Sequence, residues 1–93
     1  MIKFFFYNEL KNQNLLTKVF KSNIIKIEND EIDMGEYNLK GIVVSFDTSN
    51  IINILEDINA NKDILSKTNL PYYIKLITTK KTDRAYIVLP SSY

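Results

Sequence analysis

Few side chains in this 93-residue chain could carry out catalysis, because the sequence contains neither histidine nor cysteine. Histidine is the commonest general base and a common zinc ligand, and cysteine supplies thiolate nucleophiles and metal ligands. Ser–His and Cys–His mechanisms, His- or Cys-ligated metals and disulfides are therefore excluded. Any catalysis falls to a carboxylate, a lysine, a tyrosine or backbone amides. No cofactor is expected.

Carboxylates gather in one segment, at Glu28, Asp30, Glu31, Asp33 and Glu36. An EF-hand calcium loop needs a central glycine and a distal glutamate at fixed offsets, and this run has neither at the required place. The segment is therefore interpreted as a solvated loop, and no metal site is expected.

Basic residues collect towards both ends of the chain, although the formal net charge is only +1. Residues 1–26 hold five lysines and one glutamate, and residues 60–93 hold six basic residues and two acids. These ends are neither interleaved with exposed aromatic residues nor set on one helix, so a nucleic-acid partner is not favoured. The apolar run near the N-terminus is too short for a signal peptide or a membrane span. A cytoplasmic protein without a membrane partner is expected.

Hydrophobic periodicity predicts the elements that would position these side chains. Strands are predicted at Ile2–Tyr7, Ile24–Ile27, Leu39–Phe46, Tyr72–Thr79 and Arg84–Leu89. Helices are predicted at Leu10–Phe20 and from an N-cap at Asp47, Thr48 or Ser49 to about Ile58, with loops at Asn59–Asn69 and Lys80–Asp83. This order favours a single α+β domain over residues 1–93, a small mixed β-barrel or sheet of about five strands with two short helices.

One hydrophobic core is expected to join the strands to the second helix. Gly41, inside a predicted strand, indicates a bulge or a close approach of the backbone. The predicted core residues are Phe4, Phe6, Val43, Ile52, Leu55, Ile74, Leu76, Ile87 and Leu89.

Three segments resemble the γ-glutamylcyclotransferase-like family, and together they cover most of the chain. Residues 5–16 (FFYNELKNQNLL) resemble its opening strand, Tyr-Gly-Ser/Thr turn and short helix. Residues 39–59 (LKGIVVSFDTSNIINILEDIN) resemble its glycine-opened strand, acidic turn and helix. Residues 71–89 (PYYIKLITTKKTDRAYIVL) resemble its closing hairpin. The resemblance implies a compact mixed β-barrel with a cavity at the first strand–helix turn.

The resemblance also implies a reaction, in which the α-amine of a γ-glutamyl group attacks the γ-carbonyl and 5-oxoproline is released. Because the attack is intramolecular, holding the substrate curled supplies much of the rate. The reaction further needs a base and donors for the oxyanion, but neither His, Cys nor a metal.

Carried over by position, the family's turn falls on Tyr7, Asn8, Glu9 and Leu10. Asn8 stands where the family has glycine, and asparagine tolerates a left-handed conformation better than most residues. Glu9 stands where the family has a small hydroxyl residue. Its carboxylate would repel the α-carboxylate of a γ-glutamyl substrate.

The family's base falls on Asn59, and an amide does not take a proton at neutral pH. Glu56 and Asp57 lie close by in the sequence and are alternative bases. Tyr73 matches the tyrosine that opens the next strand. Both Tyr7 and Tyr73 also fit as packing residues of a strand, and the two acids also fit as a solvated helix face.

Three functions stay open at this point. The first is a divergent member of the family that has lost its catalytic site and acts by binding or inhibition. The second is an active γ-glutamyl-amine cyclotransferase, and the third is a small nucleic-acid-associated module. A protein partner, a small γ-glutamyl-like ligand and a second copy of the chain all remain candidate partners.

Overall fold

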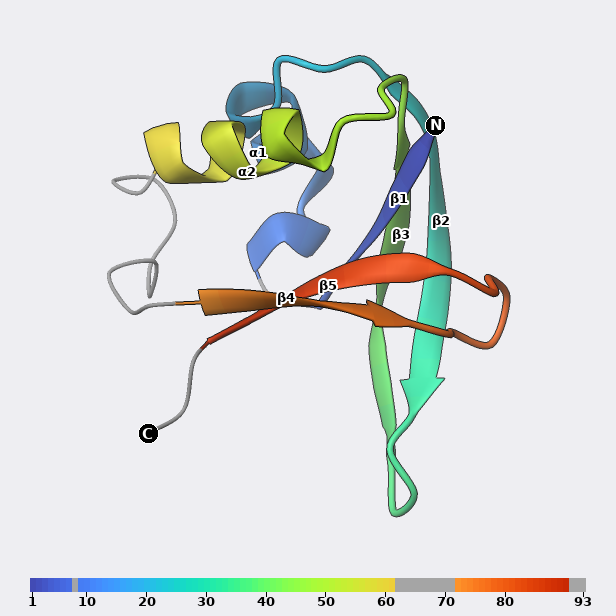
Figure 1. Ribbon diagram of the computed structural model, residues 1–93. Coiled ribbons are helices and arrows are strands. Elements are labelled where there is room, and N and C mark those ends of the chain that lie inside the picture. Colours follow the sequence, from blue (N-terminus) through green and yellow to red (C-terminus); the bar gives the residue numbers. More distant parts are fainter. Residues whose placement is uncertain (8, 62–71, 91–93) are drawn as a thin grey trace.

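The computed structural model describes residues 1–7, 9–61 and 72–90 (Figure 1). The predicted order of strands and helices is confirmed. The elements are β1 (Ile2–Phe6), a 3-10 turn η1 (Glu9–Lys11), α1 (Gln13–Val19), β2 (Ile24–Asp33), β3 (Asn38–Phe46), α2 (Ile51–Ala60), β4 (Tyr72–Ile77) and β5 (Ala85–Pro90). No helix among the described residues is long and apolar enough to cross a membrane.

The five strands form one mixed sheet in the order β2-β3-β1-β5-β4. β1 pairs with β5 in parallel, and the other neighbours are antiparallel. β2 and β4 are its edges, so the sheet is open. The sheet alternative of the sequence prediction is confirmed, and the closed barrel is not.

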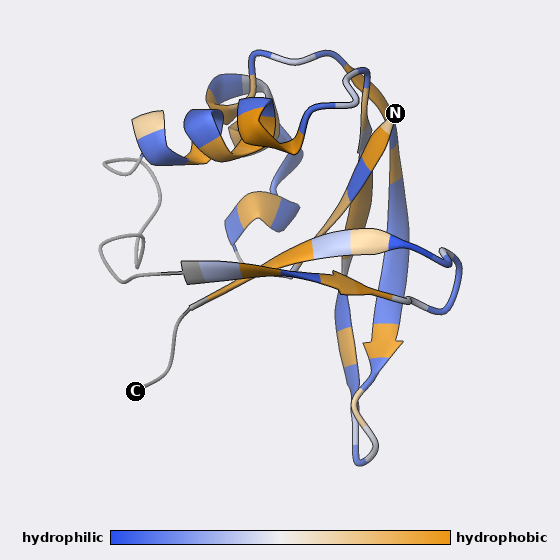
Figure 2. Ribbon diagram, in the orientation of Figure 1, coloured by the Kyte–Doolittle hydropathy of each residue, from blue (hydrophilic) through white to orange (hydrophobic). Residues whose placement is uncertain are grey.

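Both helices cover one face of this sheet, here called the helix face (Figures 1 and 2). Leu16 and Val19 of α1 and Ile54 and Ile58 of α2 belong to the same buried cluster as alternate residues of β1 and β3. The strand residues of this cluster are Ile2, Phe4, Phe6, Ile42, Val44 and Phe46. This large cluster is the main hydrophobic core.

A second cluster lies on the opposite side of the sheet, here called the Phe5 face. Its buried members are Phe5, Val43, Ala85 and Ile87. It contains no residue from a helix, so among the described residues strands and their flanks enclose it. Because side chains alternate along a strand, Phe5 points away from Phe4 and Phe6. The expectation of one core is therefore wrong, and the sheet separates two.

The sheet curls strongly, and the β4–β5 hairpin runs across the β2–β3 hairpin in Figure 1. The curl brings the turn between β4 and β5 to the edge strand β2, where the Lys80 amide donates to the Glu31 carbonyl over 3.0 Å. This contact joins the two ends of the sheet without closing it into a barrel.

Gly41 permits a close approach of β3 to β1, as predicted. A Cβ at this position would lie 2.7 Å from Cζ of Phe5 and would also meet the carbonyl oxygen of Phe6. The β-bulge, which was the alternative prediction for Gly41, is not found at this position. A register shift occurs instead in β2, between Ile24 and Lys26.

The acidic segment is not the solvated loop that was predicted, because most of it belongs to β2. Pairing with β3 extends regularly from Lys26 to Asp33, although β2 is largely hydrophilic (Figure 2). Asp30 is only 5% exposed. Backbone pairing along β3 thus overrides the low strand propensity of Asp, Glu and Asn.

The second helix begins and ends later than predicted. Its N-cap is Asn50, whose side-chain oxygen accepts a hydrogen bond from the Ile52 amide over 3.0 Å. Asp47, Thr48 and Ser49 therefore precede the cap. Asn59 was predicted to start a loop but lies within α2, and most of the remaining predicted loop lies outside the described residues.

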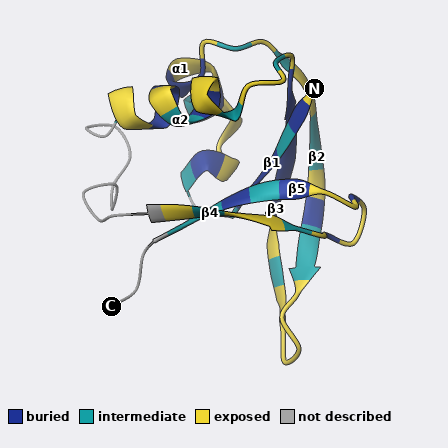
Figure 3. Ribbon diagram, viewed as in Figure 1, coloured by how far each residue is buried: buried dark blue, intermediate teal, exposed yellow. Residues whose placement is uncertain are grey.

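The predicted core is confirmed at four strand residues and wrong at Ile52 and Leu76. Phe4, Phe6, Val43 and Ile87 are buried, whereas Leu55, Ile74 and Leu89 are half-buried (Figure 3). Ile52 is 54% exposed and Leu76 42% exposed. The helix turns Ile54 and Ile58 towards the sheet, which leaves Ile52 on the solvent side. Leu76 lies on the edge strand β4.

Candidate functional site

Tyr7 and Tyr73 come together across three strands on the Phe5 face. Phe5 of β1 lies opposite Ile87 of β5, and continuing this register by two residues brings Tyr7 beside Leu89. Leu89 in turn lies opposite Tyr73 of β4. Residues in register across a sheet share a face, so these three side chains form one row. The Tyr7 ring also stacks on the ring of Phe5, with centroids 6.4 Å apart.

The environment of this row favours the protonated form of the Tyr7 hydroxyl. Burial raises the pKa of Tyr7 above its usual value of 10.0, and the negative charge that Tyr73 would carry on ionising raises it further. The second cause acts only between neighbouring groups, which agrees with the register. The Tyr7 hydroxyl is therefore able to donate a hydrogen bond at neutral pH. Tyr73 is 47% exposed and lies within reach of a ligand from solvent.

The residues of the predicted turn after β1 do not lie together at one site. Glu9 is half-buried at the start of η1, where its carbonyl accepts the Asn12 amide over 3.1 Å. Leu10 packs in the core of the helix face and so points away from the row that contains Tyr7. Asn8 lies outside the described residues.

The candidate bases lie on α2, which packs on the other face of the sheet from Tyr7 and Tyr73. Asn59 and Glu56 are exposed on this helix. Asp57 is buried, and its Oδ2 accepts a hydrogen bond from the backbone amide of Lys21 over 2.9 Å. This carboxylate thereby ties α2 to the chain that follows α1, which is a structural role.

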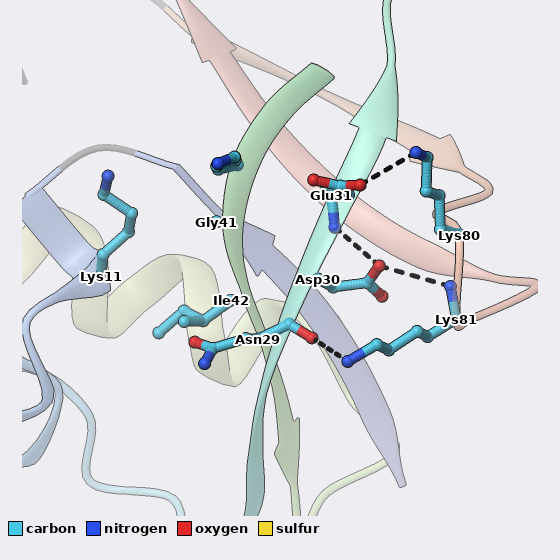
Figure 4. Close-up of a pocket in the computed structure, with 9 residues that line it drawn as sticks. Lys11, Asn29, Asp30, Glu31, Gly41, Ile42, Lys80 and Lys81 are labelled. Carbon is cyan, nitrogen blue, oxygen red and sulfur yellow. Dashed lines mark hydrogen bonds and ion pairs between the residues drawn. The ribbon is translucent and has the colours of Figure 1, made fainter.

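The sequence interpretation missed Asp30, which it assigned to a solvated loop. Its Oδ2 accepts the Thr79 hydroxyl over 2.5 Å. Its Oδ1 accepts the amides of Glu31 and Lys81 over 2.7 and 3.3 Å (Figure 4). Thr79 and Lys81 lie 49 and 51 positions from Asp30 in the sequence, whereas Glu31 is its direct neighbour. No local pattern in the sequence signals such a contact.

The acidic residues do not form a metal centre in the part of the chain that the structure describes. Nowhere there do three or more Asp or Glu side chains group as metal ligands. The carboxylates of β2 divide between the two faces of the sheet, with Glu28 and Asp30 on one face and Glu31 and Asp33 on the other.

Apart from the turn residues Asn8, Glu9 and Leu10, the residues taken from the family resemblance thus fall into two groups. Tyr7 and Tyr73 meet on the Phe5 face, whereas Asn59, Glu56 and Asp57 lie on a helix that packs on the helix face. No family model, no curated protein and no solved structure matches this chain, so its own residues carry the functional argument.

Proposed function

We propose that this chain is a divergent γ-glutamylcyclotransferase-like domain that binds a ligand without turning it over, and that it acts as a binding or inhibitory protein. The observation that carries the proposal is the separation of the two groups of residues. The tyrosine row lies on the Phe5 face, and the residues at and near the base position lie on α2, which packs on the helix face.

Cyclisation needs a base within hydrogen-bond reach of the α-amine, at about 2.6–3.2 Å. Asn59 cannot take this proton, because its side chain is an amide. The Asp57 carboxylate is engaged with the Lys21 amide, and Glu56 points to solvent from the same helix. None of these three residues offers a carboxylate beside Tyr7.

The tyrosine row nevertheless has the groups that a small polar ligand needs. The half-buried Leu89 supplies apolar surface, and Tyr7 and Tyr73 supply hydroxyl groups. Lys75 lies two residues along β4 from Tyr73, on the same face and exposed, opposite Ile87. Two phenols and one ammonium group suit a ligand with carboxylate and amide oxygens, such as a γ-glutamyl amino acid.

The binding test is isothermal titration of the purified protein with γ-glutamyl amino acids and with 5-oxoproline. Tyr7→Phe and Tyr73→Phe should each weaken binding by about two- to tenfold, because each removes one hydrogen bond. Tyr37→Phe is the matched control, since Tyr37 is an exposed tyrosine between β2 and β3. Equal affinities of all three variants and the wild type would refute a site on the tyrosine row.

An active cyclotransferase is the second candidate function, and Glu9 is the residue that favours it. This carboxylate is half-buried two positions after Tyr7, at the start of η1. If the chain does catalyse cyclisation, Glu9→Gln should abolish 5-oxoproline release while leaving the fold intact.

A further inference from the structure

A basic pocket lies over β2 and β3, away from the tyrosine row. Its volume is about 590 Å³, within the range of small-molecule sites. Residues in register form its floor, with Asn29 opposite Ile42 and Glu31 opposite Lys40. These pairs share the face on which Ile42 joins the helix-side core. These four residues therefore lie on the opposite face of the sheet from the tyrosine row, whereas Asp30 and Gly41, which also line the pocket, have the register of the Phe5 face.

The pocket carries an excess of positive charge. Its lining contains four lysines and two carboxylates, whereas the whole chain has a formal net charge of only +1. Lys80 pairs with Glu31 over 2.9 Å. Lys11 of η1 and Lys40 of β3 form no ion pair with any residue that the structure describes. Two ammonium groups from different elements, neither in an ion pair within the described part of the chain, thus line one pocket.

The other two lysines are held in place by the contact between the β4–β5 turn and β2. The buried Asp30 accepts the Thr79 hydroxyl and the Lys81 amide, and the Lys80 amide donates to the Glu31 carbonyl. The Lys81 ammonium group donates to the Asn29 carbonyl over 2.8 Å. Figure 4 shows Lys80 and Lys81 on one side of β2 and Lys11 beyond β3 on the other. A fixed turn loses less conformational entropy when a ligand binds.

Positive charge continues beyond Lys81 into a second pocket of about 520 Å³. Lys3 and Arg84 line it, with Asp83 as its one acidic residue. The parallel pairing of β1 with β5 thus brings together the basic residues of the two ends of the sequence. An extended array of cations fits a ligand with several linked negative groups better than it fits a single carboxylate.

We propose that the pocket lined by Lys11, Lys40, Lys80 and Lys81 binds a chain of linked phosphates. Lysine is a common partner of phosphate as a point charge, and phosphate groups in series carry one or more negative charges each. Such a chain reaches the free ammonium groups of Lys11 and Lys40 at one end and the fixed turn at the other. The phosphates can belong to a small anion or to a nucleic-acid backbone, and the test separates these sources.

The test titrates the ¹⁵N-labelled protein with inorganic tripolyphosphate at about 50 mM salt, where surface charges are only partly screened. Amide resonances of Lys11, Lys40 and Gly41 should shift. Lys11→Gln and Lys40→Gln should each weaken binding by about two- to fivefold, as expected for a partly exposed charge pair. Lys18→Gln, an exposed lysine of α1, removes the same charge elsewhere and should leave the affinity unchanged.

A further variant distinguishes a site with lysines held in fixed positions from general attraction of anions to a positively charged protein. Asp30→Asn makes the protein more positive, so general attraction predicts tighter binding. The proposal predicts weaker binding, because the turn that holds Lys80 and Lys81 loses its anchor. If Asp30→Asn does not fold, Thr79→Val removes the hydrogen bond from the Thr79 hydroxyl to Asp30 without changing any charge.

A labelled single-stranded oligonucleotide identifies the source of the phosphates. If it binds, is displaced by tripolyphosphate and is weakened by Lys11→Gln, the pocket takes nucleic-acid phosphates. If only tripolyphosphate binds, the ligand is a small anion. Absence of tripolyphosphate binding, or equal loss of affinity in Lys18→Gln and Lys40→Gln, would overturn the proposal. Neither result depends on the tyrosine row, so the proposed function is tested separately.

Discussion

The two faces of the sheet differ in how completely they are covered. On the helix face, α1 and α2 enclose a wide core in which Phe4, Phe46, Leu16 and Ile54 have no exposed surface. On the Phe5 face, strands enclose a smaller cluster around Phe5, and its border includes the half-buried Tyr7.

This difference indicates a division of roles between the faces. Burial of apolar surface is the main source of stability, so the helix face contributes most of the free energy of folding. The Phe5 face leaves Tyr7 half-buried and Tyr73 47% exposed at the border of its apolar cluster, where the proposed ligand would bind.

The largest expected effect comes from the helix face. Ile54→Ala should lower the free energy of unfolding by about 2–5 kcal/mol, because Ile54 is fully buried between α2 and the sheet. Ile52→Ala is the control on the same helix, and at 54% exposure it should cost less than about 0.5 kcal/mol. Urea denaturation of both variants measures the difference. Equal costs would mean that α2 is rotated relative to the sheet.

The second-largest effect on stability is expected at the contact between β2 and the β4–β5 turn. Asp30→Asn should lower the free energy of unfolding by about 1–3 kcal/mol, because buried hydrogen bonds to a carboxylate are lost or weakened. Asp83→Asn makes the same chemical change at an exposed position and serves as the control. If urea denaturation gives both variants the stability of the wild type, the turn is not anchored to β2.

The close approach of β3 to β1 on the Phe5 face can be tested by substituting Gly41. Gly41→Ala should cost about 1–3 kcal/mol, because the added Cβ meets the Phe5 ring and the Phe6 carbonyl, and β1 or β3 must shift. Thermal denaturation with a two-state fit measures the cost. A fully stable Gly41→Ala protein would show that β3 does not approach β1 as closely as described.

The smallest expected effect concerns the tyrosine row and depends on pH. Because the pKa of Tyr7 is raised in the folded protein, folding favours the protonated phenol. Stability should therefore be complete below about pH 10 and should fall as the pH rises through the pKa of folded Tyr7. Tyr7→Phe should make this decline less steep, as measured by urea denaturation at several pH values.

The proximity of Tyr7 and Tyr73 in this row predicts that the ionisation of one affects the pKa of the other. Tyr73→Phe should lower the pKa of Tyr7 towards 10, because it removes the nearby phenolate charge, although the larger contribution of burial remains. Ultraviolet absorbance titration follows this ionisation. An unchanged titration curve for the remaining tyrosines would contradict the proximity of Tyr7 and Tyr73.

The sequence sufficed to predict the order of elements, because apolar runs and polar breaks alternate clearly along the described chain. It did not determine the rotation of α2, since Ile51, Ile52, Ile54, Leu55 and Ile58 allow more than one apolar stripe. Packing against the sheet selects Ile54 and Ile58. The division into two cores depends on how the sheet curls, which periodicity does not encode.

The candidate site was predictable only in part. The family resemblance selected Tyr7 and Tyr73 from distant segments, and the strand register brings them together. The role of Asp30 depends on Thr79, which lies 49 positions away, and on the extension of β2 through an acidic segment. Local propensity argued against that extension, so the interpretation as a loop was wrong for a physical reason.

Release of 5-oxoproline is the most direct test of the central claim that this domain binds without turnover. Purified wild-type protein would be incubated with γ-glutamyl amines and γ-glutamyl amino acids, with Glu9→Gln and Asp57→Asn variants in parallel. Loss of a general base costs roughly 10²–10⁴ in rate, so the account predicts no release above the enzyme-free background, even for Asn59→Glu. Clear release by the wild type would contradict the account, and its loss in a variant that keeps the wild-type stability would assign the base to the substituted residue.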